Sequence, residues 1–310
     1  MTDPKFQEWL SGHTFTASEL ESYRLCPFKF YVESYLGLEP NLTEEPELTP
    51  IEIGTLLHRI LQLFYERHAR EIGSSPGQKL QEALREITSA ILESHQKGRP
   101  HLIPALISLQ TKRIESTLQL LLGKECAPRE TERSLKPAWF EWSFGRKTAP
   151  LELPDGNGGT IRIKGRVDRI DVDAKSKRFL VIDYKTGSQK TTGNQIRRGE
   201  ALQLPLYLLA VKKLLLPDFE PIGGLYYHLS DLSMDAGMIR SSLLPNDLEI
   251  HPSSSTFFSD VEWKEFFGNL PRRVGSITQE IRDEKSGSSD EPCQPWCPWK
   301  DLCKIRSQIS

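Results

Sequence analysis

The sequence contains few cysteines and shows no excess of either charge. Its 310 residues include 5 cysteines, and 40 Lys and Arg residues balance 42 Asp and Glu residues, for a formal net charge of −2. A nearly neutral chain is not expected to wrap nucleic acid with its whole surface, although a local basic groove is compatible with this charge. Five cysteines in a chain expected to be cytoplasmic are more typical of metal ligands or thiols than of disulfides.

Several sequence patterns are missing as well. No apolar run reaches the ~18 residues that a membrane-spanning helix needs. Residues 1–5 lack the basic and apolar stretches of a secretory signal. We therefore expect a cytoplasmic protein with no membrane partner. The phosphate-binding pattern Gly-x-x-x-x-Gly-Lys-Ser/Thr is also absent, so we expect no ATP-driven motor in this sequence.

The patterns that are present predict an α/β chain. Hydrophobic residues make up 37% and charged residues 26%, as in a globular protein. We expect a single domain over residues 1–310, in which apolar spacing and turn residues mark five segments. These are an N-terminal helix over 16–38, a helical region over 51–126, a sheet core over 137–245, a helix over 259–284 and a cysteine cluster over 291–306.

Three ionisable residues in the predicted sheet core are placed for chemistry. An apolar strand over residues 179–182 ends in Asp183 and Lys185, which are two positions apart and therefore share one face of the strand. A turn around residues 174–177 would bring Asp168, on the preceding strand, back beside Asp183. The sequence therefore predicts two carboxylates and an ammonium side by side.

Two adjacent carboxylates repel each other unless a cation lies between them. Oxygen ligands suit Mg²⁺ or Mn²⁺, and a neighbouring lysine can orient water and neutralise charge on a phosphoryl group. This combination fits metal-assisted hydrolysis of a phosphodiester. The alternative is a solvated strand end in which Asp168 pairs with Arg166 or Arg169.

Four further residues are candidates for the same site. His58 lies in a predicted helix and offers an imidazole nitrogen to a cation. Gln203 and Tyr207 are four positions apart and share a helix face, from which they would hold a phosphate or stack on a base. Glu141, on an earlier strand, would orient the lysine or water, or pair with an arginine. Taken alone, His58 is more typical of a core or surface histidine, and the Gln203–Tyr207 pair is more typical of ordinary helix packing.

Three cysteines near the C-terminus form a compact group. Cys293, Cys297 and Cys303 lie within 11 residues of a segment rich in Pro and Trp. Three thiolates do not complete a tetrahedral structural site, so a fourth ligand is needed, and Cys26 is the candidate. Thiolates alone do not distinguish zinc from an iron–sulfur cluster. Cys126 has no neighbouring motif and is interpreted as a structural or free thiol.

Taken together and in this order, the motifs resemble those of the PD-(D/E)xK nuclease superfamily, in its RecB-like exonuclease branch. Val167 replaces the proline that the superfamily name places before the first aspartate. The matching segments are Gly54–His58, Glu141–Phe144, Gly165–Asp171, Ile182–Gly187 and Gln203–Tyr207.

The resemblance implies a restriction-endonuclease-like core, with a central mixed β-sheet flanked by helices and a helical N-terminal region. It also implies a Mg²⁺- or Mn²⁺-dependent deoxyribonuclease, an exonuclease rather than an endonuclease, which acts on single-stranded DNA or DNA ends in recombination and repair. A separate helicase or recombination protein is the expected partner. The competing interpretation is a module that binds DNA without cutting it.

The resemblance also assigns roles to individual residues. Asp168, Asp183 and Lys185 would be catalytic. The metal ligands would be His58, Asp168, Asp183 and the backbone carbonyl of Tyr184. Gln203, Tyr207 and Glu141 would contact DNA or support these groups.

In AddB-type relatives, one N-terminal and three C-terminal cysteines hold a [4Fe–4S] cluster that staples the two ends of the domain. The corresponding ligands here would be Cys26, Cys293, Cys297 and Cys303. Three residues separate Cys293 from Cys297, where two are usual in the family. Zn²⁺ on the four cysteines is the lesser alternative.

Overall fold

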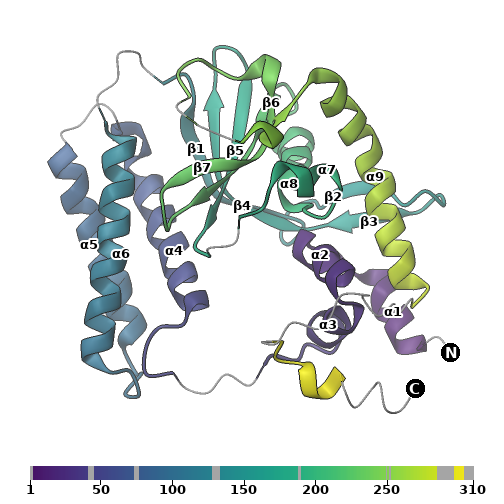
Figure 1. Cartoon of the computed structure of the whole chain (residues 1–310), viewed down its shortest axis with the longest axis horizontal. Helices are drawn as coiled ribbons and strands as arrows, with labels where there is room; N and C mark the ends of the chain where they lie inside the picture. The colour runs from purple at the N-terminus through teal and green to yellow at the C-terminus, as the bar shows by residue number, and fades with distance from the viewer. Residues whose placement is uncertain are drawn as a thin grey trace.

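The computed structural model describes residues 3–40, 45–72, 77–127, 133–187, 190–248, 250, 253–284 and 297–303. A six-stranded mixed sheet lies at its centre, in the order β1-β4-β5-β6-β7-β8 (Figure 1). The β5–β6 and β7–β8 pairs are parallel and the other neighbours are antiparallel. The strands are β1 (Lys136–Phe144), β4 (Gly165–Asp173), β5 (Arg178–Lys185), β6 (Glu220–His228), β7 (Ser233–Arg240) and β8 (Phe257–Phe258). The predicted mixed sheet flanked by helices is confirmed.

Three long helices cover one face of the sheet. They are α4 (Pro50–His68), α5 (Gly77–Gln96) and α6 (Pro104–Glu125), and a short 3₁₀ helix η2 (Ala69–Glu71) follows α4. A capping box of Thr49 and Glu52 starts α4, with Pro50 at its first position. Leu57 and Ile60 of α4 belong to the same buried cluster as Ile182 of β5, so α4 is fixed directly against the sheet.

The opposite face is covered by the helices α1 (Pro4–Gly12), α2 (Ala17–Leu25), α7 (Gly193–Arg197), α8 (Gln203–Ala210) and α9 (Asp260–Arg282). A separate hairpin of β2 (Leu151–Pro154) and β3 (Thr160–Ile163) packs into the same core. The remaining short elements are η3 (Val211–Leu215), η4 (Ser241–Leu243) and η5 (Ser254–Thr256). None of the helices that the structure describes is both long and apolar enough to cross a membrane.

The predicted continuous helix over residues 16–38 is wrong, because the chain breaks at Cys26. Cys26 is extended, with φ −157° and ψ 102°, between α2 and the short helix α3 (Pro27–Phe30), which continues as the π-helix η1 (Tyr31–Tyr35). The proline that follows Cys26 disfavours helical geometry at that residue. A capping box of Thr16 and Glu19 starts α2.

The described C-terminal segment, residues 297–303, lies against this broken helix (Figure 1). Trp299 is buried, and its indole Nε1 donates a hydrogen bond to Glu33 Oε1 at 2.8 Å. Cys26 Sγ accepts a hydrogen bond from the backbone N–H of Lys29 at 3.4 Å. Two segments nearly the whole chain apart are thus packed together, and each carries predicted cluster cysteines. Cys293 lies outside the described residues.

A buried arginine links the sheet to the α4–α6 layer. The Arg169 side chain is 2% exposed and makes a bidentate pair with Asp171, at 2.6 and 2.7 Å. Its Nη1 donates to Glu125 of α6 at 3.1 Å and to Tyr65 of α4 at 2.9 Å. Burial disfavours the charge on Glu125, but Arg169 and Arg133 together hold the pKa of its carboxyl below the ordinary value.

We expect Arg169→Met to destabilise the protein by about 3–5 kcal/mol, because it leaves the buried Asp171 without its counter-charge and leaves Glu125 with Arg133 alone. Denaturant unfolding would measure the loss. Arg198→Met is the matched control, since the Arg198 side chain is 60% exposed in its pair with Glu200 and a surface pair contributes only ~0–1 kcal/mol. Equal losses for the two variants would contradict the assignment.

Candidate active site

The site is organised by the point at which β4 and β5 stop pairing. Their antiparallel ladder ends at the Arg169–Ile182 pair. Beyond it, the backbone N–H of Tyr184 donates to the carboxylate of Asp168, at 2.7 Å from Oδ2. Asp168 and Asp183 are both buried at this divergence, at 8% and 2% exposure. A side chain thus replaces the main-chain partner of Tyr184 and holds the two strands at a fixed spacing.

Lys185 and Gln203 enclose the carboxylate of Asp183. Lys185 Nζ lies 2.7 Å from Asp183 Oδ2, and Gln203 Nε2 donates to Asp183 Oδ1 at 2.7 Å. The Gln203 carbonyl in turn accepts from Lys185 Nζ at 2.9 Å. The three side chains therefore form a closed triangle of two hydrogen bonds and one ion pair, in which the amide of Gln203 contacts both charged groups.

Tyr207 lies behind this triangle. It is 8% exposed, and its hydroxyl is 3.4 Å from Gln203 Nε2. A ring so deeply buried is unsuited to stacking on a base. The geometry accordingly favours a supporting contact for Tyr207 over the base contact that the sequence left open.

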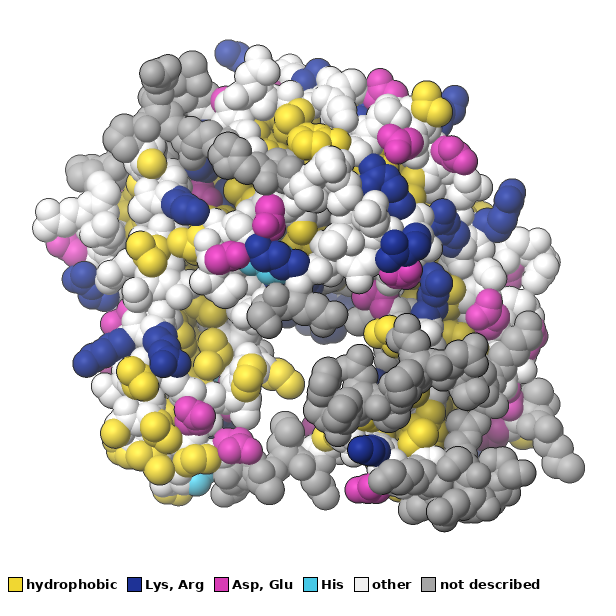
Figure 2. Space-filling model, viewed as in Figure 1, with side chains coloured by type: hydrophobic (Ala, Val, Ile, Leu, Met, Phe, Trp, Pro, Cys, Tyr) yellow, Lys and Arg dark blue, Asp and Glu magenta, His cyan; other side chains and the backbone are white. Residues whose placement is uncertain are grey.

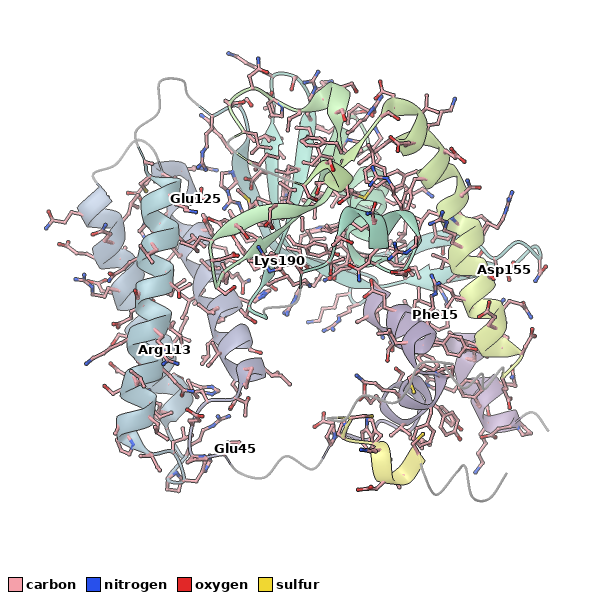
Figure 3. The ribbon with its side chains drawn as sticks, in the orientation of Figure 1. Phe15, Glu45, Arg113, Glu125, Asp155 and Lys190 are labelled. Atoms are coloured by element: carbon pink, nitrogen blue, oxygen red, sulfur yellow. The ribbon has the colours of Figure 1, made fainter. Side chains whose placement is uncertain are left out.

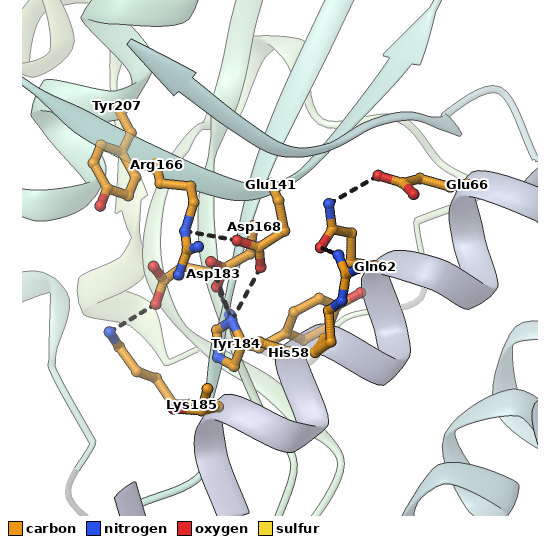
Figure 4. Close-up of polar contacts among 12 residues, drawn as sticks. His58, Gln62, Glu66, Glu141, Arg166, Asp168, Asp183, Tyr184, Lys185 and Tyr207 are labelled. Carbon is orange, nitrogen blue, oxygen red and sulfur yellow. Dashed lines mark hydrogen bonds and ion pairs between the residues drawn. The ribbon is translucent and has the colours of Figure 1, made fainter. Parts of the chain in front are cut away.

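His58 brings α4 to the other side of Asp168. Its Nδ1 lies 3.3 Å from Asp168 Oδ1 and 3.4 Å from Glu141 Oε1 (Figure 4). In the part of the chain that the structure describes, these three residues are the one group of His, Cys, Asp or Glu whose ligand atoms all lie within 4.8 Å of one another. Glu141, which the sequence left undecided, thus joins the candidate metal site.

The electrostatics of the cluster show a shortage of positive charge. Burial opposes protonation of His58, but the hydrogen bonds and charges of Asp168 and Glu141 raise the pKa of its imidazole to about 10. Burial, and then the charge of Asp168, raise the pKa of Asp183 to about 6 despite the nearby Lys185. Both shifts follow from crowding carboxylates into a space with little water.

These residues fit a hard divalent cation. Carboxylate oxygens and one imidazole nitrogen converge on a buried point, and the charge that they lack is the charge that such an ion supplies. Mg²⁺ and Mn²⁺ prefer oxygen-rich sites of this kind.

Two features of the site were not predicted. Glu21 of α2 accepts hydrogen bonds from the backbone N–H groups of Leu202 and Gln203, at 2.5 and 3.0 Å, and so fixes the start of α8. No local pattern indicates this, because the partners are about 180 positions apart. Arg169, which the sequence offered as a possible partner of Asp168, is instead buried on the other sheet face, where it pairs with Glu125 and Asp171.

The face of the molecule shown in Figure 2 is hollowed between α4 and the helices α2 and α3. The helix that carries His58 thus borders this hollow.

Comparison with known proteins identifies the relatives of the chain. Residues 14–304 match the PD-(D/E)XK nuclease superfamily. The chain is 33% identical over 222 residues to an ATP-dependent helicase/deoxyribonuclease subunit of Moorella thermoacetica, a match that covers 68% of the chain and 19% of that protein. It is 30% identical over 246 residues to the protein of the same name from Carboxydothermus hydrogenoformans, covering 74% and 22%. For Lacticaseibacillus paracasei the identity is 28% over 258 residues, covering 74% and 20%.

The chain therefore spans about a fifth of the length of these relatives. The superfamily match extends over nearly all of the chain and includes every candidate catalytic residue. The resemblance drawn from the motifs is confirmed, and the chain belongs to the PD-(D/E)XK nuclease superfamily.

Proposed function

We propose that this chain is a metal-dependent deoxyribonuclease that degrades DNA from an end. The observation that carries the proposal is the pairing of two groups at one strand divergence. The His58–Glu141–Asp168 cluster suits a cation, and the Asp183–Lys185–Gln203 triangle lies next to it. Membership of a nuclease superfamily, and relatives whose names contain helicase/deoxyribonuclease, support a DNA substrate.

The proposed ligands of Mg²⁺ or Mn²⁺ are His58, Asp168, Asp183 and the carbonyl of Tyr184, with Glu141 beside them. Such an ion, when bound, polarises a phosphoryl oxygen and lowers the pKa of water. The protein's part is to keep these donors oriented before the substrate arrives. The Tyr184 N–H holds Asp168, and the Gln203 amide holds Asp183.

Lys185 is the proposed group that positions the attacking water and stabilises charge in the transition state. Burial opposes its charge, but Asp183 raises the pKa of its ammonium above the usual value, so it is protonated at neutral pH. A fixed ammonium in a site with little water stabilises developing negative charge more strongly than a mobile one in solvent.

We expect Lys185→Ala and Asp183→Asn each to lower the rate of DNA cleavage by at least about 100-fold. The first removes the ammonium directed at the reacting phosphate, and the second removes the charge of a proposed metal ligand. The assay follows end-labelled single- and double-stranded DNA with Mg²⁺, Mn²⁺ or EDTA. Cleavage by the unchanged protein should require the metal.

Lys213→Ala is the control for this experiment, since Lys213 is an exposed lysine of η3 outside the site. Thermal unfolding of each variant would show that the fold is retained. Near wild-type cleavage by Lys185→Ala, or undiminished cleavage in EDTA, would contradict the mechanism.

The requirement for an end separates an exonuclease from an endonuclease. We expect linear single-stranded DNA to be degraded and a closed circle of the same sequence to survive, because an exonuclease has no terminus to engage on the circle. Gel analysis of both substrates with Mn²⁺ would measure this. Linearisation of the circle at a comparable rate would show an endonuclease instead.

A [4Fe–4S] cluster on Cys26, Cys293, Cys297 and Cys303 is the second part of the proposal. Two features of the described residues support it. The Trp299–Glu33 contact places the C-terminal segment against the helices that follow Cys26. The Lys29 N–H directed at Cys26 Sγ, at the start of α3, favours the thiolate that a metal binds.

Anaerobically purified protein should be brown and contain about four iron atoms per chain. Cys26→Ser should lose most of the iron and the visible absorbance and should unfold at a lower temperature, because the staple is broken. Cys126→Ser, outside the proposed ligand set, should retain the iron, the visible absorbance and the unfolding temperature of the unchanged protein. One zinc ion per chain without colour would favour the zinc alternative.

The proposed partner is a separate motor protein. The relatives carry the word helicase in their names, whereas this sequence has no Gly-x-x-x-x-Gly-Lys-Ser/Thr pattern. A helicase that unwinds duplex DNA would supply the single-stranded end on which the proposed nuclease acts.

A further inference from the structure

Glu141 holds an unusual backbone conformation in the middle of a strand. It lies in β1 between the Phe140–Arg169 and Trp142–Val167 pairs, opposite Asp168. Its φ is +49°, in the left-handed region. For a residue other than glycine this conformation is strained and persists only where the surroundings enforce it. Such strain is typical of functional sites.

The strained residue has its carboxylate between two partners. Glu141 Oε1 faces His58 Nδ1 at 3.4 Å, and Glu141 Oε2 faces the Nε of Arg166 at 2.7 Å. The Glu141 side chain is 7% exposed, whereas the Arg166 side chain is 61% exposed. A buried carboxylate thus holds the inner edge of a guanidinium whose outer part faces solvent, beside the candidate metal cluster (Figure 4).

Comparison with Arg169, three residues along the same strand, shows why Arg166 is more than a counter-charge. Arg169 neutralises buried carboxylates with all its nitrogens engaged and its side chain 2% exposed. Among the described residues, Arg166 makes one ion pair, through Nε. A guanidinium has five N–H donors, so the N–H groups of both Nη atoms of Arg166 are available to a ligand.

We propose that Arg166 binds a backbone phosphate of the DNA strand next to the cleaved one, and that Glu141 holds its guanidinium in position. The planar fork of an arginine matches two phosphate oxygens at once. The Cα atoms of Arg166 and Asp168 are two strand positions apart, or about 7 Å, and the Arg166 guanidinium lies at the outer, solvent-facing side of Glu141. The proposal therefore assigns Arg166 to a neighbouring phosphate and the cleaved phosphate to Lys185. This proposal deepens the nuclease proposal and rests on it.

The test couples protein variants to changes in the substrate. Single-stranded oligonucleotides would each carry one uncharged methylphosphonate linkage, moved along the strand one position at a time. Binding would be measured by fluorescence anisotropy in EDTA, so that the DNA stays intact. The proteins are the unchanged chain, Arg166→Gln, Arg166→Lys and the control Arg113→Gln, an exposed arginine on α6 far from the site (Figure 3).

At one linkage position, the neutral phosphate should weaken binding by the unchanged protein about tenfold or more. Arg166→Gln should show the same loss with normal DNA, and no additional loss at that position. The plot of log affinity against log salt concentration has a negative slope, and for Arg166→Gln this slope should become less steep by about 0.7, because one single-strand phosphate contact is gone. Arg166→Lys should keep the salt slope and part of the affinity, and Arg113→Gln should behave as unchanged.

Two results would overturn the proposal. One is that Arg166→Gln and the neutral linkage weaken DNA binding independently, so that their fold-losses in affinity multiply at every linkage position. The arginine then contacts none of those phosphates. The other is unchanged affinity and salt slope in Arg166→Gln. If the unchanged protein cuts DNA in either case, only this inference fails. If the unchanged protein neither binds nor cuts DNA, the proposed function fails with it.

Discussion

The hydrogen bond from the Tyr184 N–H to the Asp168 carboxylate is the contact on which the candidate site depends. It forms where the β4–β5 ladder ends, so it substitutes for the next main-chain bond of the sheet. Because it lies between two buried strands, the spacing of Asp168 and Asp183 is set by the sheet and not by flexible loops. The helices then add their groups to a fixed frame: α4 brings His58 and α8 brings Gln203.

The main cost of this frame is electrostatic. Glu141, Asp168 and Asp183 are all buried near one another, and the protein offsets their charge on two sides, with Arg166 on Glu141 and Lys185 on Asp183. The carboxylates of Asp168 and Glu141 raise the pKa of His58, which lies between them, to about 10. Burial and the charge of Asp168 raise the pKa of Asp183 to about 6. A divalent cation at the proposed site would supply the positive charge that these carboxylates lack, and would lower both shifts.

The sequence predicted those parts of the structure that rest on local patterns. Residues two apart on a strand gave the shared face of Asp183 and Lys185, and residues four apart on a helix gave that of Gln203 and Tyr207. The ordered motifs gave the superfamily and, through it, the mixed sheet. The break at Cys26 could have been predicted from Pro27, which disfavours helical geometry at the residue before it. The apolar spacing on both sides of Cys26 instead favoured one long helix.

Long-range contacts could not be predicted in this way. Glu21 reaches α8 across about 180 positions, and Arg169 contacts Tyr65 of α4 and Glu125 of α6, which are 104 and 44 positions away, so no local pattern indicates these contacts. The backbone of Glu141 is a further case, since left-handed geometry is usually indicated by glycine or asparagine. The side-chain contacts of Glu141 with His58 and Arg166 exist only in the folded chain, so they give no local signal of this geometry.

The conformation of Glu141 has a consequence for the solubility of the folded protein. β1 is the outermost strand at its end of the sheet, and an exposed strand edge is a template on which a second chain can pair and aggregate. In β1 that edge is irregular, because the register shifts between Pro137 and Trp139 and the backbone turns left-handed at Glu141. Proline and local irregularity are the features by which natural sheets block such pairing. The residue that aims a carboxylate at the candidate metal site thereby also helps to keep this edge from joining another molecule.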